Sequence, residues 1–133
     1  MIPALPKPNA MRLTLIRSAM MLGLLTFGGA TWFQHRSGHP APIAADQART
    51  FGYVFIGLAL MATAGLFMLR QRLERATEVK QQLALYLVGY GMAEGAALFG
   101  GATWFVGGDR NLYIAGLILM VVAFQILPIT RQT

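Results

Sequence analysis

Four runs of apolar residues, each about 20 residues long, limit what this chain can fold into more than any other feature of its sequence. They cover residues 13–33, 51–69, 83–106 and 112–129. An α-helix of this length crosses the roughly 30 Å of hydrocarbon in a bilayer, and none of the runs alternates as barrel strands do. We therefore predict an all-α fold, a four-helix transmembrane bundle that forms a single membrane domain over residues 1–133.

The composition agrees with a surface that faces lipid. Hydrophobic residues make up 56% of the chain and charged residues only 12%, whereas soluble domains carry about a quarter charged residues. The formal net charge is +6, but the basic residues lie at the ends of the apolar runs, as in membrane proteins. We therefore expect the lipid bilayer, and no nucleic acid, as a partner.

Other residue types exclude several kinds of active site. The chain has no cysteine, so it forms neither disulfides nor thiolate metal sites. His35 and His39 fall in a polar connection, where histidines are usually solvated. The sequence shows no phosphate-binding loop, no Ser/His/Asp set and no paired carboxylates. We expect no enzymatic activity, no metal and no cofactor.

Lysine and arginine predict the orientation of the helices. Most of them fall in the N-terminal tail with the first turn, in the connection 70–82 and at the C-terminus: Lys7, Arg12, Arg17, Arg70, Arg72, Arg75, Lys80 and Arg131. The positive-inside rule then places both termini in the cytoplasm, and we expect a bacterial inner (cytoplasmic) membrane. Aromatic residues gather at the opposite boundary, where Trp32 and Trp104 are the expected interface anchors.

One segment occurs twice. The seven residues 27–33, FGGATWF, recur letter for letter at 99–105. Each copy ends a helix that runs outward, and the stretches that follow, 57–61 and 116–120, are weakly alike. These observations predict a duplicated hairpin in parallel topology; convergence on small packing residues followed by a tryptophan anchor is the alternative.

Small residues and one carboxyl distinguish the third run. Gly89, Ala93, Ala97 and Gly101 recur at every fourth position, which predicts a smooth stripe for close helix packing, within the chain or between copies. Glu94 is the only acidic residue in any run. A charge at this depth costs about 3 kcal/mol or more.

Two roles for Glu94 remain open at this point. A neutral carboxyl that hydrogen-bonds a neighbouring helix would hold helices together, and a proton-binding carboxyl would need to release and take up its proton. The candidate neutral partners are Thr26, Thr63 and Gln125. No run contains a basic residue at the depth of Glu94, and Arg17 is expected to extend toward the cytoplasmic interface.

The segment 91–100, GMAEGAALFG, resembles the carboxylate-bearing helix of the proteolipid c subunit of rotary ATPases. Phe99 and Gly100 fall where that family has an aromatic residue and a glycine. A weaker likeness extends over residues 52–106, including the pair Arg70 and Gln71 in the basic connection. The resemblance implies a proton carried by Glu94.

Two functions from different classes follow. The first is a non-catalytic subunit that packs by small residues against other membrane subunits or copies of itself. The second is a proton-binding or proton-translocating element that resembles the c subunit and uses Glu94. A small four-helix drug exporter would also use one membrane glutamate, but on its first helix and without this charge asymmetry.

Overall fold

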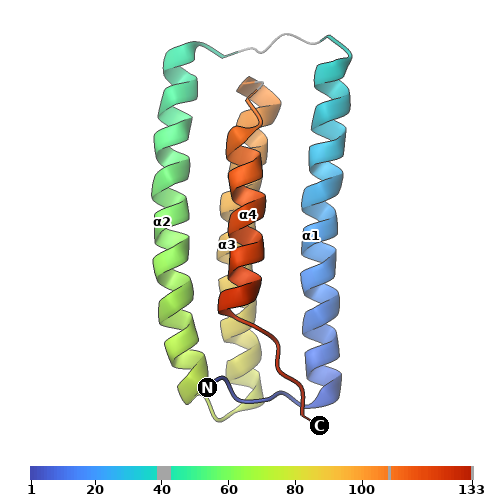
Figure 1. The fold of residues 1–133 in the computed structure, drawn as a ribbon, viewed down its shortest axis with the longest axis vertical. Coiled ribbons are helices and arrows are strands. Elements are labelled where there is room, and N and C mark those ends of the chain that lie inside the picture. Colours follow the sequence, from blue (N-terminus) through green and yellow to red (C-terminus); the bar gives the residue numbers. More distant parts are fainter. Residues whose placement is uncertain (39–42, 108, 133) are drawn as a thin grey trace.

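The structure, a computed structural model, describes residues 1–38, 43–107 and 109–132. Four helices account for nearly all of this part of the chain (Figure 1): α1 Lys7–Arg36, α2 Ala45–Arg75, α3 Val79–Gly107 and α4 Asn111–Ile126. The predicted all-α bundle of four helices is confirmed. Three of the helices, α1 to α3, are long and apolar enough to span a membrane.

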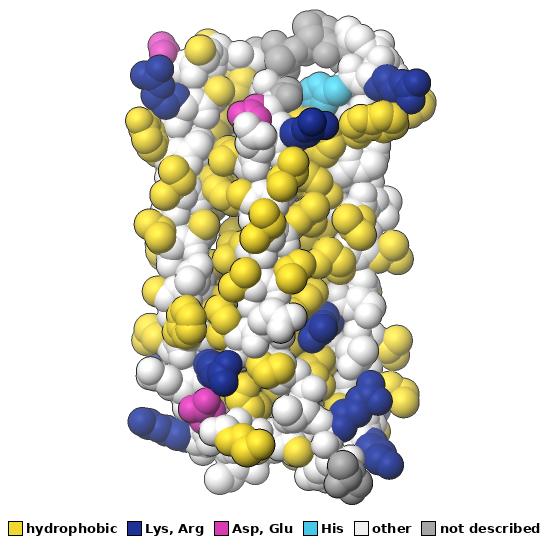
Figure 2. Space-filling view, viewed as in Figure 1, with side chains coloured by type: hydrophobic (Ala, Val, Ile, Leu, Met, Phe, Trp, Pro, Cys, Tyr) yellow, Lys and Arg dark blue, Asp and Glu magenta, His cyan; other side chains and the backbone are white. Residues whose placement is uncertain are grey.

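α3 and α4 form the centre of the bundle as an antiparallel pair. α1 and α2 lie on opposite sides of this pair (Figure 1), and no contact joins α1 to α2 within the described residues. Most charged side chains of the face in Figure 2 lie toward its two ends, and the part between them is mainly apolar, with one basic side chain within it. The helices therefore present to lipid the surface that the apolar runs predict.

α4 is much shorter than its neighbours. It has 16 residues, which span about 24 Å, less than the roughly 30 Å of a bilayer's hydrocarbon. The apolar run continues to Ile129, but the helix ends at Ile126. The reason lies in Pro128, because the residue before a proline is driven out of the helical region. Leu127 accordingly has φ −114° and ψ 68°.

The charged connection predicted at 70–82 is mostly helical. α2 continues through Arg75, and α3 begins at Val79. The amide nitrogen of the buried Gln82 side chain donates a hydrogen bond of 3.1 Å to the carbonyl of Ala76, which stabilises the sharp reversal. At the same end of the bundle, the N-terminal and C-terminal segments pair, since Leu5 donates to the Thr130 carbonyl at 2.9 Å.

Small residues allow α3 and α4 to approach closely. A Cβ atom at Gly116 would lie 2.6 Å from the Cα atom of Ala97, and one at Gly100 would lie 2.5 Å from the carbonyl oxygen of Leu112. Both obstacles are backbone atoms, which cannot rotate away. In lipid such close approach, with the van der Waals contact that it brings, is the main attraction between helices.

The two halves of the chain are not packed alike. In a duplicated hairpin, α1 would pack on α2 as α3 packs on α4, but α1 and α2 do not touch. Within the repeat, Gly28 and Gly100 are both buried, yet each faces the N-terminal part of α4. Trp104 is 7% exposed, whereas the matching Trp32 is 49% exposed. The duplication stays a hypothesis based on the sequence.

We expect Gly116→Ala to lower the free energy of unfolding by about 1–3 kcal/mol, the usual cost of overpacking. An SDS titration in mixed micelles would measure it. Gly23→Ala is the matched control, because no atom lies within 4 Å of a Cβ at that position, and alanine is the better helix former. Equal stability of the two variants would contradict the close contact between α3 and α4.

Candidate functional site

Glu94 lies midway along α3, at the edge of the protein interior. Its side chain is half-buried between the buried Ala93 and Ala97 and the exposed Gly91 and Gly95. The carboxyl makes no hydrogen bond and no ion pair with any described residue of the chain. A carboxyl in hydrocarbon without a partner is costly.

The three expected neutral partners of Glu94 do not reach it. The hydroxyl of Thr26 donates to the Leu22 carbonyl at 2.8 Å, and that of Thr63 donates to the Ala59 carbonyl at 2.8 Å. Both bonds stay within one helix turn, which is the usual choice of threonine in an apolar helix. Gln125 is exposed on α4. The structure therefore does not bring these three side chains together with Glu94, because the sequence alone does not give the directions in which side chains point.

The structure places the Gly89, Ala93, Ala97 and Gly101 stripe inside the bundle. All four residues are buried. Gly89 lies against the side chain of Leu127, and Gly101 lies against the rings of Phe27 and Tyr113. Because α1, α4 and the C-terminal segment already cover it, the stripe has no surface left for another chain.

A second pair of small residues on α3 points away from the bundle. Gly91 and Gly95 are exposed, and no atom lies within 4 Å of a Cβ at either position. Together with Glu94 and Leu98 they form what we call the α3 outer face. It borders a groove of about 390 Å³ between α2 and α3, lined by Leu58, Met61, Ala62, Gly91, Met92, Gly95, Ala96 and Phe99.

A polar cluster surrounds the point where α4 ends. The last carbonyls of a helix have no partner within it, and here side chains from α2 and α3 bind the last carbonyl of α4 and the two that follow it. The Arg70 guanidinium donates to the Ile126 carbonyl at 3.0 Å. The hydroxyl of Tyr90 donates to the Leu127 carbonyl at 2.6 Å, and that of Tyr86 donates to the Pro128 carbonyl at 2.7 Å.

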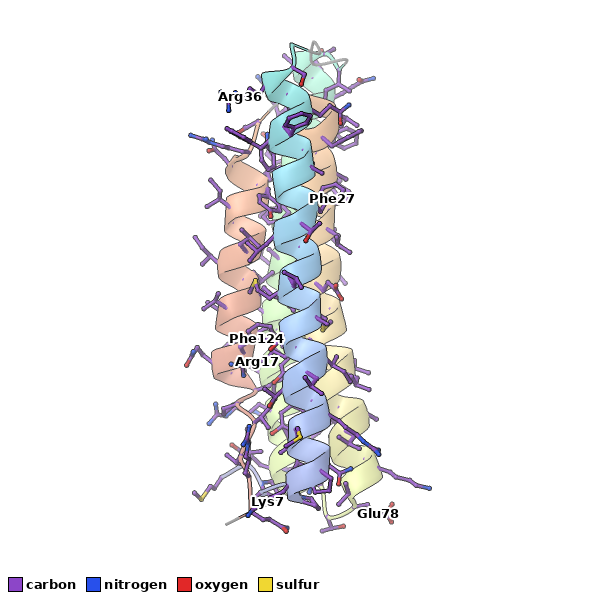
Figure 3. All side chains as sticks on the ribbon, turned by 90° about the vertical axis from the view of Figure 1, so that its right-hand side faces the viewer. Lys7, Arg17, Phe27, Arg36, Glu78 and Phe124 are labelled. Carbon is purple, nitrogen blue, oxygen red and sulfur yellow. The ribbon has the colours of Figure 1, made fainter. Side chains whose placement is uncertain are left out.

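Arg17 joins this cluster from α1. Its guanidinium carbon lies 4.5 Å from the centre of the Phe124 ring, and Figure 3 shows the two side chains together between α1 and α4. The ring in turn packs edge-on against Tyr90. Arg17 was expected only to extend toward the interface, but in the structure it also binds an aromatic face of α4, which stabilises a cation in an apolar setting.

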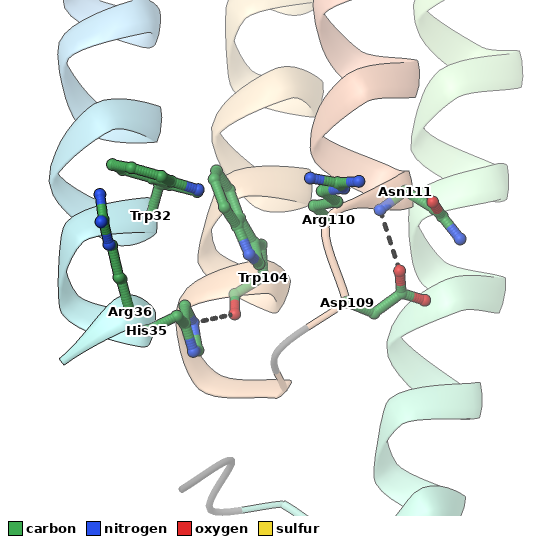
Figure 4. Close-up of a pocket in the computed structure, with 7 residues that line it drawn as sticks. All are labelled: Trp32, His35, Arg36, Trp104, Asp109, Arg110 and Asn111. Atoms are coloured by element: carbon green, nitrogen blue, oxygen red, sulfur yellow. Dashed lines mark hydrogen bonds between the residues drawn. The ribbon is translucent and has the colours of Figure 1, made fainter. Parts of the chain in front are cut away.

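His35 lies in the last turn of α1 rather than in a solvated loop. Its Nε2 is 2.8 Å from the Trp104 carbonyl. Because a carbonyl oxygen only accepts, Nε2 carries the hydrogen in this contact. The imidazole also stacks on the Trp104 ring (Figure 4), with ring centres 6.2 Å apart. His39 lies outside the described residues.

No group of three or more metal-binding side chains occurs among the described residues. Comparisons with protein-family models, with curated proteins and with solved structures find no match to this chain. Function must therefore be argued from the arrangement of its own residues, above all the unpartnered carboxyl of Glu94 and the polar cluster at the end of α4.

Sequence reasoning missed the cluster at the end of α4. Tyr90 and Leu127 are 37 positions apart, and Arg70 and Ile126 are 56 positions apart, so no local pattern joins them. Two signals were available: Tyr86 and Tyr90 share one helix face inside an apolar run, and Pro128 interrupts another run.

We expect Tyr90→Phe to destabilise the fold by about 1–3 kcal/mol, because the buried carbonyl of Leu127 would lose its donor while the ring stays. Thermal unfolding in detergent would show the loss. Tyr53→Phe serves as the control, since that side chain is 68% exposed. An unchanged stability of Tyr90→Phe would mean that this hydrogen bond contributes nothing to the fold.

Proposed function

We propose that this chain is a non-catalytic subunit of a membrane complex and that it assembles through the α3 outer face. The observation that carries the proposal is the carboxyl of Glu94, half-buried at the edge of an apolar helix and without a partner in the described part of the chain. Such a group is retained in a membrane segment when it has a role there. A hydrogen bond to another helix would satisfy it.

The glycines beside Glu94 support the same conclusion. Gly91 and Gly95 are spaced as in the small-xxx-small pairs at which transmembrane helices meet. Since no atom of the described residues lies within 4 Å of a Cβ at either glycine, another helix can approach the α3 backbone there. Glu94 lies between them in the sequence, so that the same helix would come within reach of its carboxyl.

The partner that this surface favours is a second copy of the chain. A two-fold interface brings the same residues of both copies together. Two neutral carboxyls complement each other, because each has one donor and one acceptor. Two Glu94 side chains can therefore satisfy each other across the axis, while the paired glycines allow the two α3 helices to touch.

Disulfide trapping in native membranes tests this interface, and the chain has no cysteine of its own. We expect Leu98→Cys to form a dimer on mild oxidation. Ile114→Cys should not, although it is matched in exposure, at 44% against 42% for Leu98, and lies at a similar level on α4. Crosslinking of both variants, or of neither, would contradict the proposed surface.

Substitution of Glu94 in the Leu98→Cys background tests the role of the carboxyl. Glu94→Leu should weaken dimerisation about threefold to tenfold, the value of a hydrogen bond between membrane helices. Glu94→Gln keeps a donor and an acceptor and should dimerise like the parent. If Leu98→Cys instead crosslinks to a different protein, the partner is another subunit and not a copy.

A second candidate function is proton binding by Glu94, in the manner of the c subunit that segment 91–100 resembles. It is favoured by the position of Glu94 as the only acidic residue within the apolar runs. The same Glu94→Gln variant separates the two functions. An amide cannot release a proton, so a proton-carrying chain would assemble normally and lose all proton movement, measured with a pH-sensitive dye in vesicles.

A further inference from the structure

A cavity lies at the end of the bundle where α1 and α3 end and α4 begins. It has a volume of about 550 Å³, and we call it the tryptophan pocket. Figure 4 shows its lining, which consists of Trp32, His35, Arg36, Trp104, Asp109, Arg110 and Asn111. Neither the proposed assembly surface nor Glu94 is part of it.

Two arginines of the tryptophan pocket have hydrogen-bond donors to spare. Neither Arg36 nor Arg110 forms an ion pair with a carboxylate of the described chain. The nearby carboxylate of Asp109 instead accepts a hydrogen bond of 2.9 Å from the backbone N–H of Asn111, at the first turn of α4. Two guanidinium groups against one carboxylate leave a net positive charge, which suits an anion with one negative charge.

The two tryptophans of the tryptophan pocket indicate how deep it lies in the membrane. Trp104 is held rigidly by the hydrogen bond from His35 to its carbonyl and by the Tyr113 ring, 5.1 Å away between ring centres. Trp32 is half-exposed beside Arg36. Tryptophans concentrate at the level of lipid head groups. The anion that is abundant at this level is the phosphodiester of a phospholipid.

An apolar cavity lies below the tryptophan pocket on the same side of α1. It has about 450 Å³ and is lined by the apolar side chains of Met21, Leu22, Leu25 and Phe124, with Arg17 and Ser18 at the end of α1 that lies farther from the tryptophan pocket. On a helix, Met21, Leu25, Trp32 and Arg36 share one face, since they are spaced by four, seven and four positions. The two cavities therefore follow one another along the side of α1 that faces α4, as the head and the chains of a lipid do.

We propose that the tryptophan pocket binds the phosphodiester head group of a phospholipid, with Arg36 and Arg110 donating to the phosphate oxygens. Charge-assisted bonds from guanidinium to phosphate are among the strongest in proteins. The acyl chains lie along the side of α1 that faces α4, over Leu25 and Met21. A free phosphate would use the arginines alone and gain nothing from the apolar cavity.

Tryptophan fluorescence reports on this pocket directly, because the only two tryptophans of the chain are Trp32 and Trp104. The probe is phosphatidylglycerol that carries bromine near the head-group end of its acyl chains, titrated into the protein in detergent. We expect the double variant Arg36→Gln/Arg110→Gln to need at least about tenfold more lipid for half-quenching, because it removes both charged donors and the loss of one charge-assisted bond already implies about tenfold.

Two controls decide how the result is read. Arg49→Gln removes an exposed arginine of α2 at the same end of the bundle and should be quenched like the parent. Arg36→Lys/Arg110→Lys keeps the charge and should retain part of the affinity, which excludes a folding defect as the cause. Equal quenching of the parent and the double glutamine variant would overturn the site.

A competition arm identifies the source of the phosphate. Inorganic phosphate in the millimolar range, compared with chloride at the same ionic strength, should leave the quenching by brominated lipid nearly unchanged. If phosphate instead displaces the lipid fully, the pocket takes a soluble phosphate and the assignment to a phospholipid is wrong.

Discussion

The structure depends on how the carbonyl groups at the end of α4 are satisfied. A backbone carbonyl inside an apolar bundle must find its donor within the protein, since lipid offers none. α4 ends at Ile126, and Leu127 beyond it is completely buried. Side chains of α2 and α3 bind the three carbonyls that are released there, so one helix end ties three helices together.

The same requirement is met again at the other end of the bundle. The Trp104 carbonyl lies in the last turn of α3, where it has no partner within the helix, and His35 of α1 donates to it. α1 packs mainly on α3 and touches α4 in few places. The His35 contact adds a polar link from α1 to α3, and the hydrogen bond from Tyr113 to the Leu24 carbonyl adds one from α4 to α1. Polar contacts at the helix ends, together with close packing at the small residues between those ends, hold the bundle together.

Glu94 differs from these bound carbonyls, because its carboxyl has no partner among the described residues. The chain provides donors for carbonyls more than 30 positions away along the sequence, yet among its described residues none binds the Glu94 carboxyl, the most costly group in the apolar helices. The stripe of small residues that begins at Gly89 could have packed against another protein, but it is buried against other parts of the same chain. The exposed pair Gly91 and Gly95 has no described neighbour within 4 Å of a Cβ. The proposed assembly depends on this contrast between the buried small residues and the exposed ones.

The sequence predicted the elements of the fold better than their relations. Apolar length was sufficient for the four helices, because in a membrane no other element satisfies its own backbone. Even the early end of α4 could have been found from Pro128. The sequence could not predict which helices contact each other, since the apolar surfaces of α1 and α2 are alike in composition. The close contacts at Gly28, Gly100 and Gly116 determine how the helices are placed.

The candidate site shows the same limit. The sequence correctly drew attention to Glu94 as an unusual residue, but it named Thr26 and Thr63 as partners, and these hydroxyls bind their own helices. It gave Tyr86 and Tyr90 no role, and it noted Arg70 only for the orientation of the helices and for the likeness to the c subunit. Their role appears only when distant segments meet at the end of α4.

Exchange of the tyrosine hydroxyl protons tests most directly whether the carbonyls at the end of α4 are bound within the protein. With carbon-13 at the tyrosine Cζ position, a slowly exchanging hydroxyl gives two Cζ signals in mixed light and heavy water. Among the four tyrosines, such binding predicts split signals for Tyr86 and Tyr90 and a single averaged signal for the exposed Tyr53. Single averaged signals for Tyr86 and Tyr90 would contradict it.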